Sequence, residues 1–193
     1  MTPKSFSVVI IKNANICTQG RHPEDILSNL CGNDFCFDEI QCGCMESFLQ
    51  ALMYQDEQLQ LTICRCKARE LERFSNINWD GSMPLWWKSR QINRHSAEYE
   101  ALLLEAYQSL FLWCARFRDA LMATEGKQLV YNSGNKDPNK SNLTDDEFCA
   151  ILMTVRANNS EDYKREFGIR NAIKKLNRQL EKVAYSFGNF ADI

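Results

Sequence analysis

The longest helical pattern in the chain lies between Ser96 and Ala123, and it constrains the fold more than any other feature. Its apolar residues recur at steps of three and four, namely Tyr99, Leu102, Leu103, Ala106, Leu110, Phe111 and Cys114. This apolar stripe is broad, so the helix is expected to be mostly buried by neighbouring elements. A turn near Leu112 would divide it and begin a second helix, Ala115–Ala123. The chain is therefore expected to pack around a long internal helix.

The composition fits one compact domain with a sizeable core. Of the 193 residues, 45% are apolar and 25% are charged, proportions typical of a globular domain. The net charge of -2 implies no strong sequence-independent attraction to nucleic acid. The apolar run Val8–Ile11 is too short for a secretion signal or a membrane span. The chain also has nine cysteines, an odd number. The short apolar run and the odd number of cysteines together predict a cytoplasmic protein with reduced thiols and no membrane association.

Four cysteines close together in the sequence raise the alternative of a zinc cluster, because four thiolates can bind zinc. They are Cys31, Cys36, Cys42 and Cys44. Their C-x4-C-x5-C-x-C spacing is not that of a zinc ribbon. Free cysteine behaves as a small apolar residue, so buried or surface thiols are the favoured interpretation.

The remaining patterns of this compact domain predict further helices and few short strands. The predicted strands are Ser5–Lys12, Phe35–Cys42 and Lys127–Tyr131. A helix is predicted from Met45 and another over Gln58–Leu71. Thr144 and Glu147 form a capping box that opens a helix through Arg156. Residues 1–157 are assigned to this domain.

The last segment, Ser160–Phe187, is predicted to be an extra C-terminal helix. Its apolar residues follow steps of four, three, four, three and four, and they are Ile169, Ile173, Leu176, Leu180, Val183 and Phe187. Such a seam covers about two and a half heptads. Two main interpretations remain open for this basic amphipathic segment, residues 158–193. It packs back on the domain, or it lies at an oligomer interface such as a homodimer, with nucleic-acid contact a minor third alternative.

The candidate site lies in the stretch Leu27–Tyr54, where the carboxylate of Glu46 stands at the start of an apolar helix. Gln50 follows four residues later and shares its face. The spacing by itself favours two solvated side chains. The functional alternative is a ligand held against this face, with Ser28 and Asn29 as nearby polar groups.

Several short motifs occur in a specific order along residues 26–156. They are Leu27–Leu30 (LSNL), Phe37–Asp38, Glu46, Gln50–Ala51, Asn78–Trp79 and Leu129–Val130. This order resembles the NADAR superfamily, the group related to the YbiA-type N-glycosidases. The resemblance implies an α+β fold, a compact and mostly helical single domain with few short strands and with a pocket near the Glu-bearing helix. It also implies hydrolysis of a bond between ribose C1 and nitrogen, in phosphoribosyl substrates or in ADP-ribose attached to guanine in nucleic acid.

On this resemblance, Glu46 would be the catalytic carboxylate. Cleavage of an N-glycosidic bond builds positive charge on the sugar, which a carboxylate stabilises, or the carboxylate deprotonates the attacking water. Ser28 and Asn29 would hold phosphate or ribose, and Gln50 and Asp38 would orient the sugar or Glu46. The full implied substrate-binding set is Ser28, Asn29, Asp38, Ser47, Gln50, Trp79, Arg94 and Tyr107. This hydrolysis needs no metal or redox cofactor, and none is predicted.

The sequence departs from the family pattern at its basic positions. Ser47 stands where the family has histidine, and Met53 and Tyr107 stand where it has lysines. Methionine can neither form a Schiff base with an opened ribose nor supply a positive charge.

Two hypotheses follow from these departures. The first is an N-glycosidase that uses Glu46 and water, with Lys67, Lys88 or Arg94 supplying the positive charge. The second is a catalytically degenerate protein that binds an ADP-ribose-like nucleotide as a sensor or sponge.

Overall fold

The computed structural model describes residues 7–11, 22–74 and 79–188, and for residues 180–188 it describes the backbone alone. Cys17, Asn78 and both ends of the first predicted strand lie outside the described residues. The chain divides into two units, Met1–Arg156 and Ala157–Ile193.

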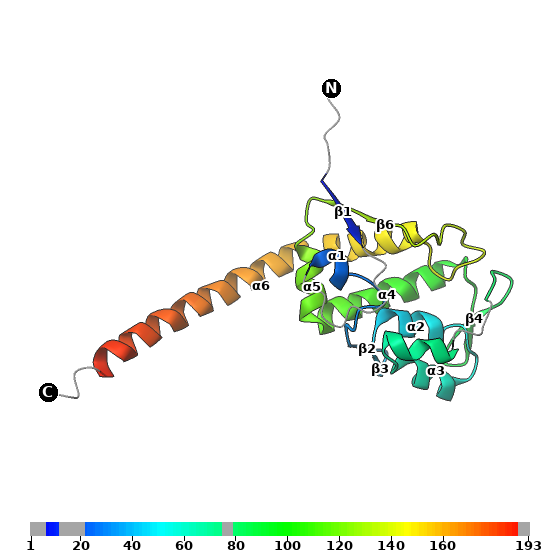
Figure 1. Ribbon diagram of the computed structural model, residues 1–193, viewed down its shortest axis with the longest axis horizontal. Coiled ribbons are helices and arrows are strands. Elements are labelled where there is room, and N and C mark those ends of the chain that lie inside the picture. Colours follow the sequence, from blue (N-terminus) through cyan, green and yellow to red (C-terminus); the bar gives the residue numbers. More distant parts are fainter. Residues whose placement is uncertain (1–6, 12–21, 75–78, 189–193) are drawn as a thin grey trace, which may run out of the picture. The chain divides into compact units, whose positions relative to one another are not determined.

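The centre of the first unit is α4 (Ala97–Trp113), which confirms the long internal helix (Figure 1). The Ser96 hydroxyl caps its start by accepting a hydrogen bond from the Tyr99 N–H at 3.2 Å. The predicted division is also confirmed, because extended backbone at Cys114 separates α4 from α5 (Ala115–Met122). Five of the seven residues of the predicted stripe are buried, and they are Tyr99, Leu103, Ala106, Leu110 and Phe111.

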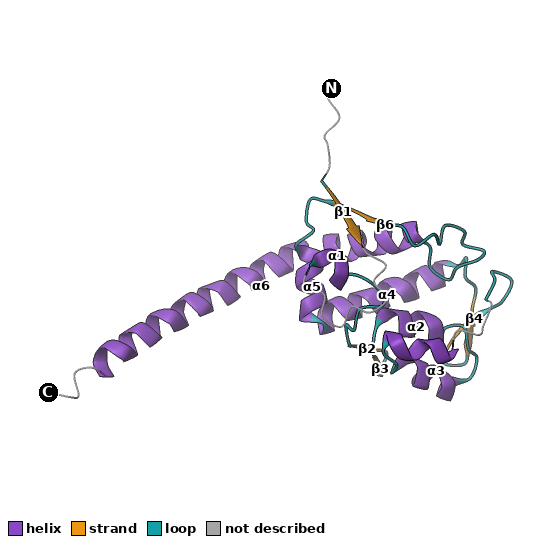
Figure 2. Ribbon diagram, viewed as in Figure 1, coloured by secondary structure: helices purple, strands orange, loops and turns teal. Residues whose placement is uncertain are grey.

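Strands are few and short, and helices dominate the first unit (Figure 2). The first and third predicted strands are confirmed as β1 (Val8–Ile11) and β6 (Gln128–Tyr131). They pair in parallel, with Ile11 opposite Tyr131. The sheet thereby brings the end of β6 back beside the N-terminal part of the domain.

The prediction of a single strand over Phe35–Cys42 was wrong. The segment is a hairpin of β2 (Phe35–Phe37) and β3 (Ile40–Cys42). At its turn, Asp38 and Glu39 have positive φ angles of 49° and 67°. Two successive positive φ angles are typical of the tight turns that join antiparallel strands. Asp-Glu is not the Asn-Gly or Asp-Gly signal by which such turns are recognised.

A second hairpin of the same kind was not predicted at all. It consists of β4 (Leu85–Trp87) and β5 (Arg90–Ile92). Lys88 and Ser89 form its turn with φ angles of 48° and 59°. The ring of Trp87 packs against Phe48 at 5.1 Å between centroids, so this tryptophan belongs to the core.

The short helices of the first unit are α1 (Pro23–Ile26), α2 (Met45–Ala51) and α3 (Glu57–Cys64), followed by the 3-10 helix η1 (Ala68–Phe74). The helix predicted over Gln58–Leu71 therefore ends early. The Cys64 carbonyl accepts hydrogen bonds from the Gly43 N–H and the Ser47 hydroxyl, both at 2.8 Å. The end of α3 is thus joined to the beginning of α2, and the chain turns away after Cys64.

The capping box at Thr144 is confirmed. The Thr144 N–H donates to Glu147 Oε2 at 2.8 Å, and the Glu147 N–H donates to Thr144 Oγ1 at 3.3 Å. The helix that it opens, α6 (Asp145–Gly188), does not end at Arg156 as predicted. The two predicted helices are one, because the residues between them include no proline to interrupt it. Among the described residues, no helix combines the length and apolar character that crossing a membrane requires.

Candidate active site

Glu46 lies in the first turn of α2 and is partly buried. Its backbone N–H donates to the Asn29 carbonyl at 3.0 Å, which ties α2 to the loop after α1. No group of the described residues donates a hydrogen bond to its carboxylate. Burial raises the pKa of Glu46 above its usual value, because the charged form is poorly solvated there. The carboxylate of Glu46 is therefore poorly solvated and makes no hydrogen bond within the described part of the chain.

Tyr107 approaches this carboxylate from α4. It is fully buried, and its hydroxyl donates to Asn29 Oδ1 at 2.7 Å. Burial, and then the negative charge of Glu46, raise the pKa of the Tyr107 phenol well above its usual value. Asn29 is thus hydrogen-bonded to both residues. Its backbone carbonyl accepts from the Glu46 N–H, and its side-chain oxygen accepts from the Tyr107 hydroxyl. The structure brings together these three residues of the predicted site.

Tyr131, at the end of β6, was not predicted as a site residue. Burial, followed by the negative charges of Glu46 and Asp145, raises the pKa of Tyr131 to about 12. Its ring meets Phe148 edge to face at 5.0 Å between centroids. The available sequence signal was its position directly after the Leu129–Val130 motif. Two protonated phenols therefore lie within the electrostatic reach of Glu46.

The buried carboxylate of Asp145 holds the loop that follows Tyr131. It accepts hydrogen bonds from the Ser133 N–H at 3.0 Å, from the Gly134 N–H at 3.1 Å and from the Ser133 hydroxyl. The first residue of α6 therefore fixes the chain where β6 ends. Asp145 was not predicted as a functional residue.

Asp38 is engaged away from Glu46. Its carboxylate accepts a hydrogen bond from Trp87 Nε1 at 3.0 Å and forms an ion pair with Lys88 Nζ at 2.9 Å. These two contacts join the two hairpins. Burial acts to raise its pKa, but Lys88 and Trp87 lower that pKa overall. The described contacts of Asp38 are thus structural, and its predicted role with the sugar stays a prediction.

Ser47 and Ser28 are both buried. The Ser47 hydroxyl donates to the Cys44 carbonyl at 2.6 Å and accepts from the Cys44 N–H at 3.2 Å, in addition to its bond with Cys64. It therefore completes the start of α2. The Ser28 hydroxyl accepts from the Leu30 N–H at 3.4 Å, a contact within its own loop.

Two predicted residues carry buried polar atoms without a partner among the described residues. They are Oε1 of Gln50, one turn after Glu46, and the ring Nε1 of Trp79. An unpaired buried polar atom costs about 1–3 kcal/mol.

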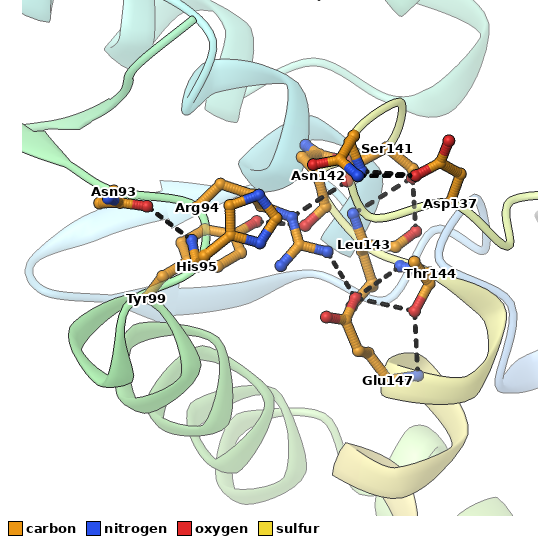
Figure 3. A network of polar contacts seen from close by, with 11 residues as sticks. Asn93, Arg94, His95, Tyr99, Asp137, Ser141, Asn142, Leu143, Thr144 and Glu147 are labelled. Carbon is orange, nitrogen blue, oxygen red and sulfur yellow. Dashed lines mark hydrogen bonds and ion pairs between the residues drawn. The ribbon is translucent and has the colours of Figure 1, made fainter. Parts of the chain in front are cut away.

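Each of the three side chains expected to supply positive charge forms an ion pair with a carboxylate. Arg94 is 4% exposed and donates to Glu147 Oε2 at 2.6 Å and to the Ser141 carbonyl at 3.0 Å, as Figure 3 shows. Lys67 pairs with Asp34, and Lys88 with Asp38. A cavity of about 250 Å³ lies beside Arg94 between α4 and α6, and its lining does not include Glu46.

The cysteines do not form a metal centre within the described part of the chain, where no group of three or more Cys, His, Asp or Glu side chains could hold a metal ion. Cys31, Cys42 and Cys44 are buried, and Cys36 is half-buried. Burial raises the pKa of the Cys44 thiol to about 11, so it stays protonated at neutral pH. These thiols therefore pack as small apolar groups.

Comparison with known proteins identifies the family of this chain. Residues 21–157 match the family described as "Bacteriophage protein GP30.3". The chain belongs to this family. A similar protein is the uncharacterized 17.1 kDa protein of the Gp30-rIII intergenic region of Enterobacteria phage T4, 28% identical over 139 residues. These residues are 70% of the present chain and 91% of the phage T4 protein.

The GP30.3 domain also has a counterpart among solved structures. The NMR structure of the E. coli protein YbiA superposes with a TM-score of 0.54 at 19% identity, covering 81% of this chain and 87% of YbiA. This confirms the NADAR-like α+β fold predicted from the sequence. The GP30.3 match includes Glu46, Tyr107 and Tyr131 and ends at residue 157.

Proposed function

We propose that this protein is an N-glycosidase that hydrolyses a ribose C1–nitrogen bond in an ADP-ribosyl or phosphoribosyl substrate. Glu46 would be the catalytic carboxylate. The observation that carries the proposal is the environment of Glu46, a partly buried carboxyl with a raised pKa and no hydrogen-bond donor among the described residues. The NADAR-like fold supports the same assignment.

The chemistry needs one carboxylate. As the C1–N bond breaks, its electron pair leaves with the nitrogen and positive charge develops on the ribose. The ionised Glu46 stabilises this charge, and a poorly solvated carboxylate does so more strongly than one in water. Water then attacks C1 and gives a proton to Glu46, for which a raised pKa is suited. Glu46 passes that proton to the departing nitrogen, which completes the leaving group and restores the carboxylate.

The neighbours of Glu46 would position the sugar. Tyr107 occupies Asn29 Oδ1, which leaves the Asn29 amide nitrogen as a donor for a ribose or phosphate oxygen. The unpaired Oε1 of Gln50 would accept a hydrogen bond from a sugar hydroxyl. The same contacts fit a free nucleotide and one attached to nucleic acid.

A second function is binding of an ADP-ribose-like nucleotide without cleavage. It is favoured by the pairing of the three expected cations, since Lys67, Lys88 and Arg94 each contact a carboxylate within the described residues. Met53, in place of the family lysine, supplies neither charge nor nucleophile.

A chromatographic turnover assay tests the proposal. The assay compares wild type, Glu46→Gln and the control variant Glu39→Gln. Glu39 is an exposed carboxylate in a hairpin turn. Each protein is incubated with three substrates. These are NAD, an ADP-ribosyl-guanine oligonucleotide and a phosphoribosylated pyrimidine amine. Wild type and Glu39→Gln are expected to release base from at least one, and Glu46→Gln is expected to be about 10²–10⁴-fold slower.

Calorimetry with ADP-ribose separates the two functions. Binding without turnover by wild type would establish the second function. Turnover that survives in Glu46→Gln would remove Glu46 as the catalytic residue, and neither binding nor turnover would reject both functions.

A further inference from the structure

The apolar stripe of α6 comes in two separate pieces. The first is Phe148, Leu152 and Val155, all buried in the first unit. The next positions at the same spacing are polar, Asn159, Asp162 and Glu166, and the apolar residues resume at Ile169. The distal piece is therefore not a continuation of the core of the GP30.3 domain, whose match ends at residue 157.

The distal piece presents large apolar side chains on one helix face. Ile169, Ile173 and Leu176 are 55%, 52% and 55% exposed. Leu180, Val183 and Phe187 continue the same alternating steps of four and three in the sequence. Single exposed apolar residues are ordinary, but a contiguous row on one face is typical of an interaction surface. A helix of this kind gains most of its stability by packing that face.

The charged residues of this segment are at heptad positions opposite the apolar row. Between residues 171 and 187, the positions that flank the apolar row are all uncharged, namely Ala172, Asn177, Gln179, Ala184 and Ser186. The charged residues stand at the outward heptad positions, namely Lys174, Lys175, Arg178, Glu181 and Lys182. Arg170, the one charged flanking residue after Glu166, is paired with Glu166 on the same helix at 3.2 Å.

We propose that residues 166–187 form a two-stranded helical seam with a second copy of this chain. In a two-stranded coil the flanking positions of one helix face those of the other, so charges of one sign there would repel an identical helix. The uncharged flanks remove this repulsion, and the cations of both copies point outward. A partner recognised by charge would instead require charged flanking positions. The second copy is thus the occupant that the charge pattern fits.

Sedimentation equilibrium of the full chain tests the seam from low to high micromolar concentration. Wild type is expected at twice the chain mass of 22.4 kDa. Ile173→Asp should weaken the dimer roughly 100-fold or more, because each copy loses a buried isoleucine and gains a charge. Asn171→Asp is the matched control, since it adds the same side chain at an outward position of the same helix turn and should leave the dimer intact.

Circular dichroism checks that the GP30.3 domain of both variants still unfolds cooperatively, so that loss of the dimer is not loss of the fold. A wild-type chain that remains monomeric throughout would overturn the proposal. The proposal would also be overturned if the Ile173→Asp variant dimerised as strongly as the Asn171→Asp variant.

Discussion

Glu147→Gln removes the negative partner of a buried guanidinium while it keeps the size and shape of the side chain. Arg94 is 4% exposed, and its head group lies 5.1 Å from the centre of the Tyr99 ring. The same Glu147 oxygen accepts hydrogen bonds from the Thr144 N–H and hydroxyl, both at 2.8 Å. One carboxylate therefore serves both the buried cation and the start of α6 (Figure 3).

The expected cost follows from the exposure of the two partners. Breaking a fully buried ion pair by removing one partner costs about 3–5 kcal/mol. Glu147 is 38% exposed, so water screens part of the interaction, and glutamine still offers Arg94 an oxygen acceptor. Hydrogen bonds to charged groups contribute about 1.5–3 kcal/mol, so we expect a loss of about 2 kcal/mol. For a chain of this size, this corresponds to a fall in Tm of about 4–8 °C.

Urea unfolding at pH 7, followed by circular dichroism, measures this loss. The control is Glu98→Gln, because the Arg90–Glu98 pair is exposed, with 70% and 41% of the two side chains accessible. That control should cost less than about 1 kcal/mol. A Glu147→Gln variant no less stable than Glu98→Gln would refute the reasoning, since it would mean that Arg94 recovers water or another partner at little cost.

The difference between wild type and Glu147→Gln should also depend on pH. Burial acts to raise the pKa of Glu147, but Arg94 and Thr144 lower that pKa overall. The stabilisation from a carboxyl with a lowered pKa is present above its unfolded pKa and is lost as the pH falls through the folded pKa. The two proteins should therefore converge in stability in acid, below the usual carboxyl range.

Two further predictions concern α2. The raised pKa of Glu46 means that the native state retains a proton that the unfolded chain releases, so stability falls as the pH rises from the usual carboxyl pKa through the folded one. Glu46→Gln should thus have a higher Tm than wild type at pH 8 and no advantage at pH 4, and an equal gap at both pH values would contradict this. Gly43→Ala should cost about 3 kcal/mol in urea unfolding, because its Cβ would lie 2.9 Å from the Cys66 carbonyl carbon and closer still to its oxygen. The control Gly32→Ala meets nothing within 4 Å and should cost far less, and equal losses would mean that this backbone contact yields freely.

Local patterns in the sequence were sufficient for several helices. The apolar row of α4, the break at Cys114 and the capping box of Thr144 and Glu147 all depend on residues within a few positions of one another. Such features act through contacts between neighbouring turns, so they can be recognised in the sequence. The position of Glu46 on a helix was predicted from apolar spacing, whereas the NADAR-like fold was predicted from a family resemblance carried by short motifs in a specific order.

Elements that depend on distant partners could not be predicted. The turns at Asp38–Glu39 and Lys88–Ser89 carry no standard hairpin signal, and α3 ends where its last carbonyl meets Gly43 and Ser47. The exposed polar residues that follow Arg156 gave no sign that α6 continues.

The candidate site shows the same division. Glu46 and Gln50 lie on one short helix, so their shared face could be recognised in the sequence. Tyr107 and Tyr131 reach Glu46 from α4 and β6, and Asn29 reaches it from a loop, so only the tertiary structure gathers the four. The raised pKa of Glu46 was also decided by the tertiary structure, because burial raises that pKa, and burial is a property of the packed domain rather than of the helix that carries the residue.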